Sequence, residues 1–479
     1  MRYIAPLALF VLTGMSVPAH GQYVNGYVES DSTLFNTAMG ASALPSDGGT
    51  YNTANGYVAL FSDTTGDHNT ASGALALYAN TTGNSNTASG AAALRANTTG
   101  SANTASGAAA LYFNTTGYGN TAIGTSALNG NTAGYYNTAS GLEALGYNTT
   151  GYQNSASGAL ALLSNTTGYD NTAAGYSALI TNTTGLGNTA TGASALYSNT
   201  TGGANTASGA SALYSNTTGE WNTASGASAL VANTTGYGNT ATGTSALQSN
   251  TTGNYNAASG ASALAYNTTG GGNTAVGFGS LANNATGSSN IAIGYNAGSA
   301  VTLSNNIDIG NAGVSTDKGA IRIGTKGTHK EAFIEGVYTT PLQANSLPVY
   351  VNANGRLSVG TSSERFKTAI APMGSGSENL QKLRPVSFHL KNDLQGARQY
   401  GLIAEEVAQI YPELVVRDEK GEIQGVRYDE LAPMLLNEVQ RQVDEVHRQG
   451  ETIAEQGREL RDLRKELAEL KTALRARGT

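Results

Sequence analysis

A 17-residue unit, N-T-A-x-G-x-x-A-L-x-x-N-T-T-G-x-x, repeats along more than half of this 479-residue chain. Fifteen units start in phase, from Asn52 to Asn290, and a sixteenth at Asn36 lies one residue out of phase. The Ala and Gly of N-T-A-x-G occur in every unit, and the Leu of A-L fails only in the last. Units this similar adopt the same local structure and stack on one another.

The length and composition of the unit select a β-solenoid. A helical repeat needs roughly 30 or more residues, and Gly, Asn and Thr are poor helix formers. Seventeen residues fit one coil of two short strands, with the Ala of N-T-A and the A-L pair facing inward. We expect the Gly of N-T-T-G to take a positive φ, and Asn and Thr to form ladders that bond their copies one coil away. Rungs about 4.8 Å apart predict a rod on the order of 75 Å long from roughly 16 coils.

The inward set of two Ala and one Leu per coil is small. It buries too little apolar area to offset the ordering entropy of 17 residues, so we expect the Leu row to face other chains. Four segments, Ala122–Gly124, Asn290–Gly294, Ile307–Gly310 and Ile321–Gly324, carry a resemblance to the head repeats of trimeric adhesins over about residues 36–325. The resemblance implies a left-handed β-roll in which three chains pack side by side.

Charge is nearly absent from the repeats. Only 12% of the chain is charged, it has no Cys, and Arg95 is the only Lys or Arg between Asn36 and Asn305. Nucleic-acid binding rests on Lys and Arg at phosphates, so we exclude that class. Six scattered acids in the array and five dispersed His in the chain offer neither the carboxylate pair of a glycosidase nor a metal site. We expect no cofactor and no metal.

Residues 1–21 have the pattern of a secretory signal peptide, and residues 22–35 form an N-terminal segment before the repeats. Arg2 gives the positive start, Ile4–Leu12 the apolar run, and Ala19–Gly21 the cleavage site, so the mature chain starts at Gln22. No later segment offers about 18 apolar residues, so we expect no membrane span in the mature chain. The predicted location is secreted or at the cell surface.

The composition changes after the repeats. Residues 326–361 predict a β-rich neck interrupted by Pro341 and Pro348, with a hairpin around Asn354-Gly355. Residues 362–438 predict a small charged α+β domain. Its expected elements are a strand at Pro385–Leu390, a helix at Leu402–Ile410, a hairpin over Leu414–Tyr428, and a long helix with Asp429 as its N-cap.

Four motifs carry a second resemblance, over about residues 362–440. They are Ser362–Lys367, Tyr400–Val407, Tyr411–Leu414 and Val426–Asp429. The segment resembles the intramolecular chaperone domain at the C-termini of phage endosialidases, tail spikes and many secreted bacterial fibres. This resemblance implies a domain that trimerises, drives folding of the fibre, and releases itself by autoproteolysis between Thr361 and Ser362.

The residues of the junction suit that chemistry. A Ser hydroxyl is a weak nucleophile and needs a base, and a lysine buried in a packed trimer can serve. Ser362 is therefore the candidate nucleophile and Lys367 the candidate base, while Arg365 binds a carboxylate or shapes the site. Ser363 stands where the family usually has Asp. The implied activity is a self-cleaving serine endopeptidase that acts once on its own chain, with no external substrate. In the alternative, the domain stays uncleaved.

A heptad pattern follows over residues 439–479 and predicts a parallel coiled coil with polar core layers that fix its register. One core position holds Val439, Val446, Ile453, Leu460, Leu467 and Leu474. The other holds Gln442, Gln449, Gln456, Leu463 and Leu470.

These features together predict a mainly β protein. Its parts are a trimeric left-handed β-roll of 17-residue coils, a small α+β chaperone domain and a coiled-coil helix. The predicted function is a secreted homotrimeric fibre, adhesive or structural, matured by its chaperone; the alternatives are an uncleaved fibre with a permanent trimerisation domain, or an ice-binding β-solenoid. The candidate ligand is a host surface or a glycan, which Tyr side chains at variable positions could stack upon. These are Tyr118, Tyr135, Tyr136, Tyr152, Tyr169, Tyr237 and Tyr255.

Overall fold

The computed structural model describes residues 29–31, 34–45, 49–334, 346–352, 354–391, 396–418 and 420–477. The predicted signal peptide, the predicted mature start at Gln22 and the interruption at Pro341 lie outside the described residues. The chain divides into two compact units, residues 1–333 and residues 334–479, and each is described by itself.

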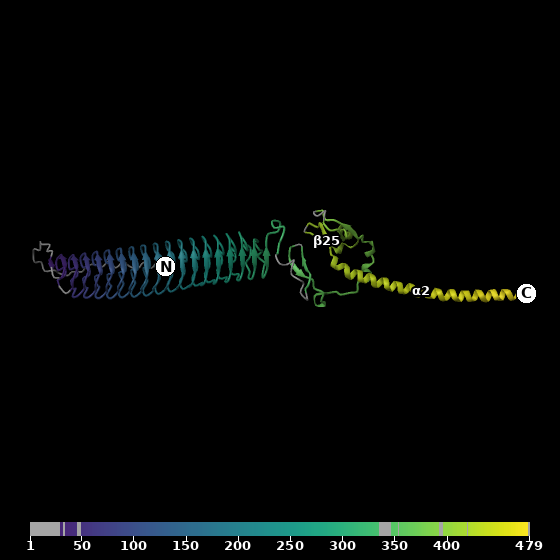
Figure 1. Ribbon diagram of the computed structural model, residues 1–479, viewed down its shortest axis with the longest axis horizontal. Coiled ribbons are helices and arrows are strands. Elements are labelled where there is room, and N and C mark those ends of the chain that lie inside the picture. The colour runs from purple at the N-terminus through teal and green to yellow at the C-terminus, as the bar shows by residue number, and fades with distance from the viewer. Residues whose placement is uncertain are drawn as a thin grey trace. The chain divides into compact units, whose positions relative to one another are not determined.

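The first unit is a parallel β-solenoid, seen as a stack of coils in Figure 1. Consecutive strands from β2 to β19 pair in parallel and in register, so that Ala173 lies opposite Ala190, while β1 pairs antiparallel with β2. The strands are β1 (Glu29–Asp31), β2 (Asn36–Met39), β3 (Thr53–Asn55), β4 (Thr70–Ser72), β5 (Thr87–Ser89), β6 (Thr104–Ser106), β7 (Thr121–Ile123), β8 (Thr138–Ser140), β9 (Ser155–Ser157), β10 (Thr172–Ala174), β11 (Thr189–Thr191), β12 (Thr206–Ser208), β13 (Thr223–Ser225), β14 (Thr240–Thr242), β15 (Ala257–Ser259), β16 (Thr274–Val276), β17 (Ile291–Ile293), β18 (Ile307–Ile309) and β19 (Ile321–Ile323).

The predicted solenoid of 17-residue coils is confirmed, with one strand per coil instead of two. The A-L segment of each described coil is a turn. Its Leu takes a left-handed backbone, with φ near 52° at Leu162, and this turns the side chain into the interior. Leu162 and its counterparts from Leu60 to Leu264 are 0% exposed within one chain. The expectation that the Leu row faces other chains is therefore wrong.

Two rows of buried Asn complete the interior. In the N-T-T row, Asn165 Nδ2 donates to Asn148 Oδ1 at 2.8 Å and to the Gly168 carbonyl at 2.9 Å. In the N-T-A row, Asn171 donates in the same way to Asn154 Oδ1 at 3.1 Å. These ladders confirm the prediction for Asn, and they satisfy polar groups that are costly to bury unpaired. Asn171 Nδ2 also donates to the Gly185 carbonyl at 2.9 Å within its own unit, so hydrogen bonds join the two parts of one coil and supplement the small apolar set.

Thr and Gly differ in detail from the expected pattern. The Thr166 hydroxyl donates to the backbone carbonyl of Thr183 at 3.0 Å instead of to its side chain, so this row bonds the backbone of the next coil. Among these glycines a positive φ occurs at the Gly of N-T-A-x-G, for example 142° at Gly175, and not at the Gly of N-T-T-G. A Cβ on Gly175 would lie 2.5 Å from the Gly192 carbonyl oxygen, because successive coils approach closely there.

The second unit contains short strand pairs, three-residue and four-residue 3-10 turns, and two α-helices. The hairpin at Asn354-Gly355 is confirmed by the antiparallel pair β20–β21, and the second hairpin by β24–β25. The elements are β20 (Val349–Val351), β21 (Leu357–Val359), η1 (Glu364–Phe366), η2 (Gly374–Ser377), η3 (Leu380–Lys382), β22 (Val386–Phe388), β23 (Gln399–Gly401), α1 (Ala404–Ile410), η4 (Pro412–Leu414), β24 (Val415–Arg417), β25 (Ile423–Val426) and α2 (Tyr428–Ala476).

Helix α2 begins at Tyr428, with Arg427 at its N-cap position, so Asp429 lies in the first turn instead of capping it. The small core of the unit joins α1, η4 and the first turns of α2. Its buried side chains are Leu380, Val407, Tyr411, Leu414, Val415 and Met434. The remainder of α2 is exposed beyond Glu438 except at half-buried positions.

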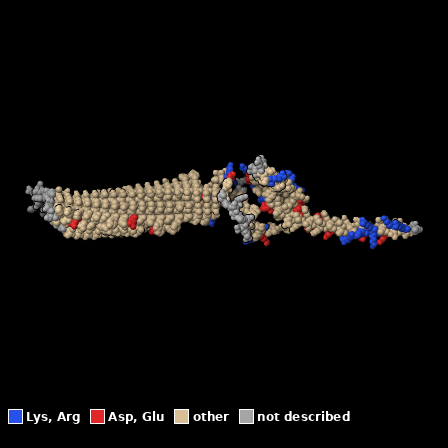
Figure 2. Space-filling view, in the orientation of Figure 1, with Lys and Arg blue, Asp and Glu red and all other residues tan. Residues whose placement is uncertain are grey.

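Charge is distributed unevenly along the chain. In Figure 2 the solenoid surface is almost free of Lys and Arg, while both signs gather on the second unit and along α2. Within the described ranges, no helix is both long and apolar enough to cross a membrane.

Candidate functional site

The predicted autoproteolytic junction follows strand β21 directly. Thr361, Ser362, Ser363, Arg365 and Lys367 are all exposed. Turn η1 separates the candidate nucleophile from the candidate base, and its backbone bonds run from Phe366 N–H to the Ser363 carbonyl at 3.0 Å and from Lys367 N–H to the Glu364 carbonyl at 2.9 Å. The two candidate residues therefore lie on either side of one short turn.

The single chain does not complete a catalytic dyad. Among the residues that the structure describes, neither the Ser362 hydroxyl nor the Lys367 ammonium has a hydrogen-bond partner, and no side chain buries either group. The Arg365 guanidinium lies over the Phe366 ring, 4.6 Å from its centroid, so it is held by its neighbour and not by a carboxylate. Within the described part of the chain, neither group is packed in a way that would activate it.

Helix α2 presents an unpartnered apolar row. Its members are between 48% and 68% exposed and are three, four or seven residues apart, which places them on one helix face. They are Val439, Val443, Val446, Ile453, Leu460, Leu463, Leu467, Leu470 and Leu474. A face of this size in water marks an interaction surface.

The Tyr row of the solenoid is a continuous ring stack. Tyr118, Tyr135, Tyr152 and Tyr169 stand on successive coils, with ring centroids 5.1, 4.9 and 4.7 Å apart and planes within 6° of parallel. The faces of the two inner rings are therefore covered by neighbouring rings. A sugar can reach ring edges and hydroxyls along this row, and an open ring face only at its two ends.

The N-T-T triplets match the glycosylation acceptor pattern, and the fold favours their structural role. The Asn of each triplet from Asn80 to Asn267 is 0% exposed. Its amide nitrogen, as at Asn165, already donates two hydrogen bonds inside the solenoid. A glycan on that nitrogen is incompatible with the folded coil.

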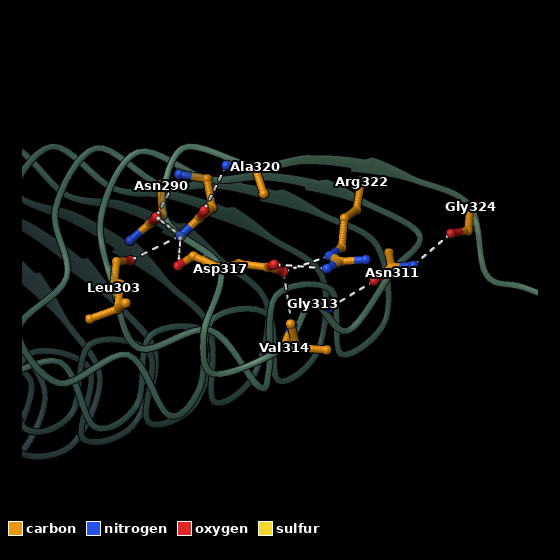
Figure 3. Close-up of polar contacts among 10 residues, drawn as sticks. Asn290, Leu303, Asn311, Gly313, Val314, Asp317, Ala320, Arg322 and Gly324 are labelled. Atoms are coloured by element: carbon orange, nitrogen blue, oxygen red, sulfur yellow. Dashed lines mark hydrogen bonds and ion pairs between the residues drawn. The ribbon is translucent and has the colours of Figure 1, made fainter. Parts of the chain in front are cut away.

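Sequence reasoning missed a charged cluster at the end of the solenoid. Asp308 occupies the strand position that holds Ala in the preceding coils, and it is 1% exposed. Burial, reinforced by the charge of Asp317, raises the pKa of Asp308 to about 6. Figure 3 shows Asp317 and Arg322 facing each other, joined at 2.5 and 2.7 Å. The signal was available in the sequence as the replacement of Ala by Asp and then Arg in the last two strands.

A second buried acid lies near the other end. Asp63 takes the Asn position of the N-T-T row in the first in-phase coil and is 0% exposed. It accepts from Asn80 Nδ2 at 2.8 Å, and burial raises its pKa to about 6. Each Asn of this row from Asn80 to Asn267 donates to the coil before it, as Asn97 does to Asn80, so Asp63 supplies an acceptor where that row begins among the described residues.

The comparisons with known proteins concern the second unit. Residues 362–416 match the family described as the chaperone of endosialidase. No curated protein and no solved structure matches the chain. The matched segment starts at Ser362 and extends from η1 to β24. The chain therefore combines a parallel β-solenoid with a later segment, residues 362–416, that is similar to the chaperone of endosialidase.

Proposed function

We propose that this protein is a secreted homotrimeric fibre whose C-terminal domain acts as an intramolecular trimerisation chaperone and is then released by autoproteolysis between Thr361 and Ser362. The observation that carries the proposal is the chaperone-of-endosialidase match over residues 362–416, directly behind a parallel solenoid and its neck. Export rests on the signal-like pattern of residues 1–21. An adhesive or structural role fits a long surface with almost no charge.

The exposed row of α2 supports assembly through that helix. Three copies packed along Val446, Ile453 and Leu460 would remove the row from water, and the Gln layers at Gln442 and Gln449 would fix their register. A helix that fixes the register between chains is needed because the coils are nearly identical. A chain displaced by one whole coil presents nearly the same surface to its neighbours, so the repeats themselves specify their register poorly.

The proposed release step uses Lys367 as the base and Ser362 as the nucleophile. Lys367 accepts the proton of the Ser362 hydroxyl, and Oγ attacks the carbonyl carbon of Thr361. The amide nitrogen of Ser362 leaves and takes up that proton, which leaves an ester between Thr361 and Ser362 Oγ and a free amine on Ser362. Water then hydrolyses the ester to a Thr361 carboxylate and restores the hydroxyl. Because both side chains are exposed in one chain, the step is expected only after assembly packs them together.

Two other functions have an observation in their favour. Ser363 in place of the family's Asp favours an uncleaved fibre with a permanent trimerisation domain. An exposed row of Thr on the outer face of the solenoid sheet, such as Thr189 and Thr206, favours an ice-binding surface. Thermal hysteresis of the purified solenoid would support the ice-binding function over the adhesive one.

The test of the main proposal is to express residues 22–479 and analyse the denatured product by electrophoresis and mass spectrometry. Cleavage predicts a fragment of 118 residues (479 − 362 + 1) that starts at Ser362. The fragment should be absent in Ser362→Ala and in Lys367→Ala, and present in Ser363→Ala as the matched control. Ser363→Asp should cleave faster.

A single intact band in the wild-type chain would end the autoproteolysis proposal and leave the uncleaved fibre. Sedimentation of the same sample measures assembly separately. A monomeric mass would contradict the trimer.

A further inference from the structure

The outer face of the last four solenoid strands is aliphatic except at Thr274 of β16. Two columns of side chains run across β16 to β19 in register: Ile291, Ile307 and Ile321 in one, and Val276, Ile293, Ile309 and Ile323 in the other. Ile307 is half-buried, and the other six are between 38% and 74% exposed. This is a contiguous aliphatic patch on a sheet face that is otherwise mainly polar.

The same positions in the earlier coils are filled mainly by hydroxyl side chains. On β12 they are Thr206 and Ser208, both exposed, and on β13 they are Thr223 and Ser225. Isolated apolar exceptions such as Ile123 on β7 occur singly. Single exposed apolar side chains are normal on a protein surface, whereas a contiguous patch marks a contact.

We infer that the outer face of β16–β19 is the surface through which copies of the fibre pack against each other, while the Thr and Ser face of β3–β15 stays in water. This inference rests on the proposed assembly and names its contact surface in the solenoid. The Leu row, from which such a contact was expected, lies inside each coil and is not available.

A second copy of this chain is the occupant that we assign to the patch, because the same face on another copy covers it without burying a charge. Neither column carries a charge, because Asp308 and Arg322 occupy the inward position of their strands, so two such faces are complementary to each other. The heptad row of α2 is likewise complementary to another copy of itself.

Because of its position along the chain, the patch can hold the copies together after cleavage, which α2 cannot do. Release at Thr361 would remove α2 together with the chaperone domain. The patch lies before the cut and stays with the fibre, so it can hold the chains together afterwards. The hydroxyl face cannot do the same in a dry contact, because each buried hydroxyl would then need a new hydrogen-bond partner.

The absence of Cys from the chain permits a direct test. Ile293→Cys places a thiol in the patch, and Ser225→Cys places one in the corresponding column on β13. Both positions are exposed in the single chain, so both variants should fold. The rate of thiol labelling is measured by mass spectrometry on the whole chain or, if it is cleaved, on its 22–361 part, with sedimentation of the same samples.

The expected result is an assembled protein in which the thiol of Ile293→Cys labels roughly tenfold or more slowly than the thiol of Ser225→Cys, because labelling in the patch then waits for the contact to open. Assembly with equal rates would overturn the inference and leave the proposed function in place. Slow labelling at both sites would overturn the restriction to β16–β19. A monomeric mass would overturn the proposed assembly itself, and the inference with it.

Discussion

The coils of the solenoid bury their Leu side chains, whereas helix α2 leaves its apolar row exposed. In the solenoid each coil buries its own Leu, as at Leu162, and encloses it with Asn ladders. In α2 the apolar row from Val439 to Leu474 lies in water. Each coil from Leu60 to Leu264 thus covers its own Leu within one chain, whereas the row on α2 is left exposed. We therefore expect the coils to fold within one chain, and the surfaces left exposed, the α2 row and the aliphatic patch of β16–β19, to serve the proposed assembly.

The largest effect on stability is expected from a Leu-to-Ala change in the solenoid, which can be compared with the same change in α2. Leu162→Ala removes a fully buried side chain and leaves a cavity, which should lower the free energy of unfolding of the solenoid by about 2–5 kcal/mol. Leu467→Ala removes a side chain that is 54% exposed and should leave the melting of the solenoid unchanged. Thermal unfolding by circular dichroism measures the first effect.

Sedimentation at several concentrations measures the effect of the same two changes on assembly. Leu467→Ala should promote dissociation, whereas Leu162→Ala should not change the assembled mass below its melting temperature. If both variants lost the same solenoid stability, α2 would be part of the fibre's own fold and the contrast would fail.

The second prediction concerns the polar part of the interior. Asn165→Ala removes the acceptor of Asn182 Nδ2 and leaves Asn148 Oδ1 without that donor. Buried groups deprived of their partners should cost about 1–3 kcal/mol of solenoid stability. The matched control is Thr167→Ala, two residues on and exposed, which should melt as the wild type does. Equal melting of the two variants would mean that the ladder contributes no net stability.

The third prediction uses the buried acid Asp63. Its folded-state pKa, raised by burial to about 6 from an ordinary 3.8, means that the folded chain binds a proton more tightly than the unfolded chain. Stability should therefore rise by roughly 1–3 kcal/mol as the pH falls from above 6 towards 4. Asp308 acts in the same direction, so the pH dependence should shrink in Asp63→Asn and shrink further in the double variant with Asp308→Asn.

Asp67 should make stability depend on pH in the opposite direction to Asp63. Hydrogen bonds from the backbone and hydroxyl of Thr50 lower the pKa of Asp67, so its contribution is present at neutral pH and is lost as the pH falls through that lowered value. Asp67→Asn should therefore destabilise the chain at pH 7 and have little effect once Asp67 is protonated. Melting temperatures between pH 7.5 and 3 measure both cases. A wild-type chain that loses stability between pH 7 and 5 would contradict the role given to Asp63.

Much of this fold could be predicted because the repeat is regular. The coil length, the parallel register and the Asn ladder follow from which residues recur at which phase, and the Asn-Gly hairpin follows from turn chemistry. The direction of the Leu row did not follow. It depends on left-handed backbone at non-glycine positions, such as Leu160 with φ 61° and Leu162 with φ 52°, which residue preferences disfavour. The second strand expected at A-L was wrong for the same reason.

The candidate site could be predicted only as a motif. Ser362 and Lys367 are identified by local sequence, and the single chain keeps them exposed. In the proposed function, the packing that buries and activates them comes from other copies of the chain, and no pattern in one sequence contains that packing. The charged end of the solenoid, in contrast, was predictable, since Asp308 and Arg322 interrupt a column of Ala.

The smallest effect on stability is expected in the Tyr row, where it can be compared with an effect on glycan binding. Tyr135 stacks on rings 5.1 and 4.9 Å away on either side. Tyr135→Ala should cost roughly 0.5–1.5 kcal/mol through lost ring contacts, beyond the area it buries. The control is Tyr266→Ala, since Tyr266 is 61% exposed and stacks on no ring among the described residues.

Tyr135→Phe distinguishes the two roles that the row can play. It keeps both stacked faces and removes one hydroxyl, so the melting temperature should stay at the wild-type value. Because the inner ring faces are covered, a glycan bound along the row must contact edges and hydroxyls, and its affinity in a glycan-array measurement should fall in Tyr135→Phe. Unchanged glycan binding together with lower stability in Tyr135→Ala would assign the row to packing alone, as in the rest of the solenoid.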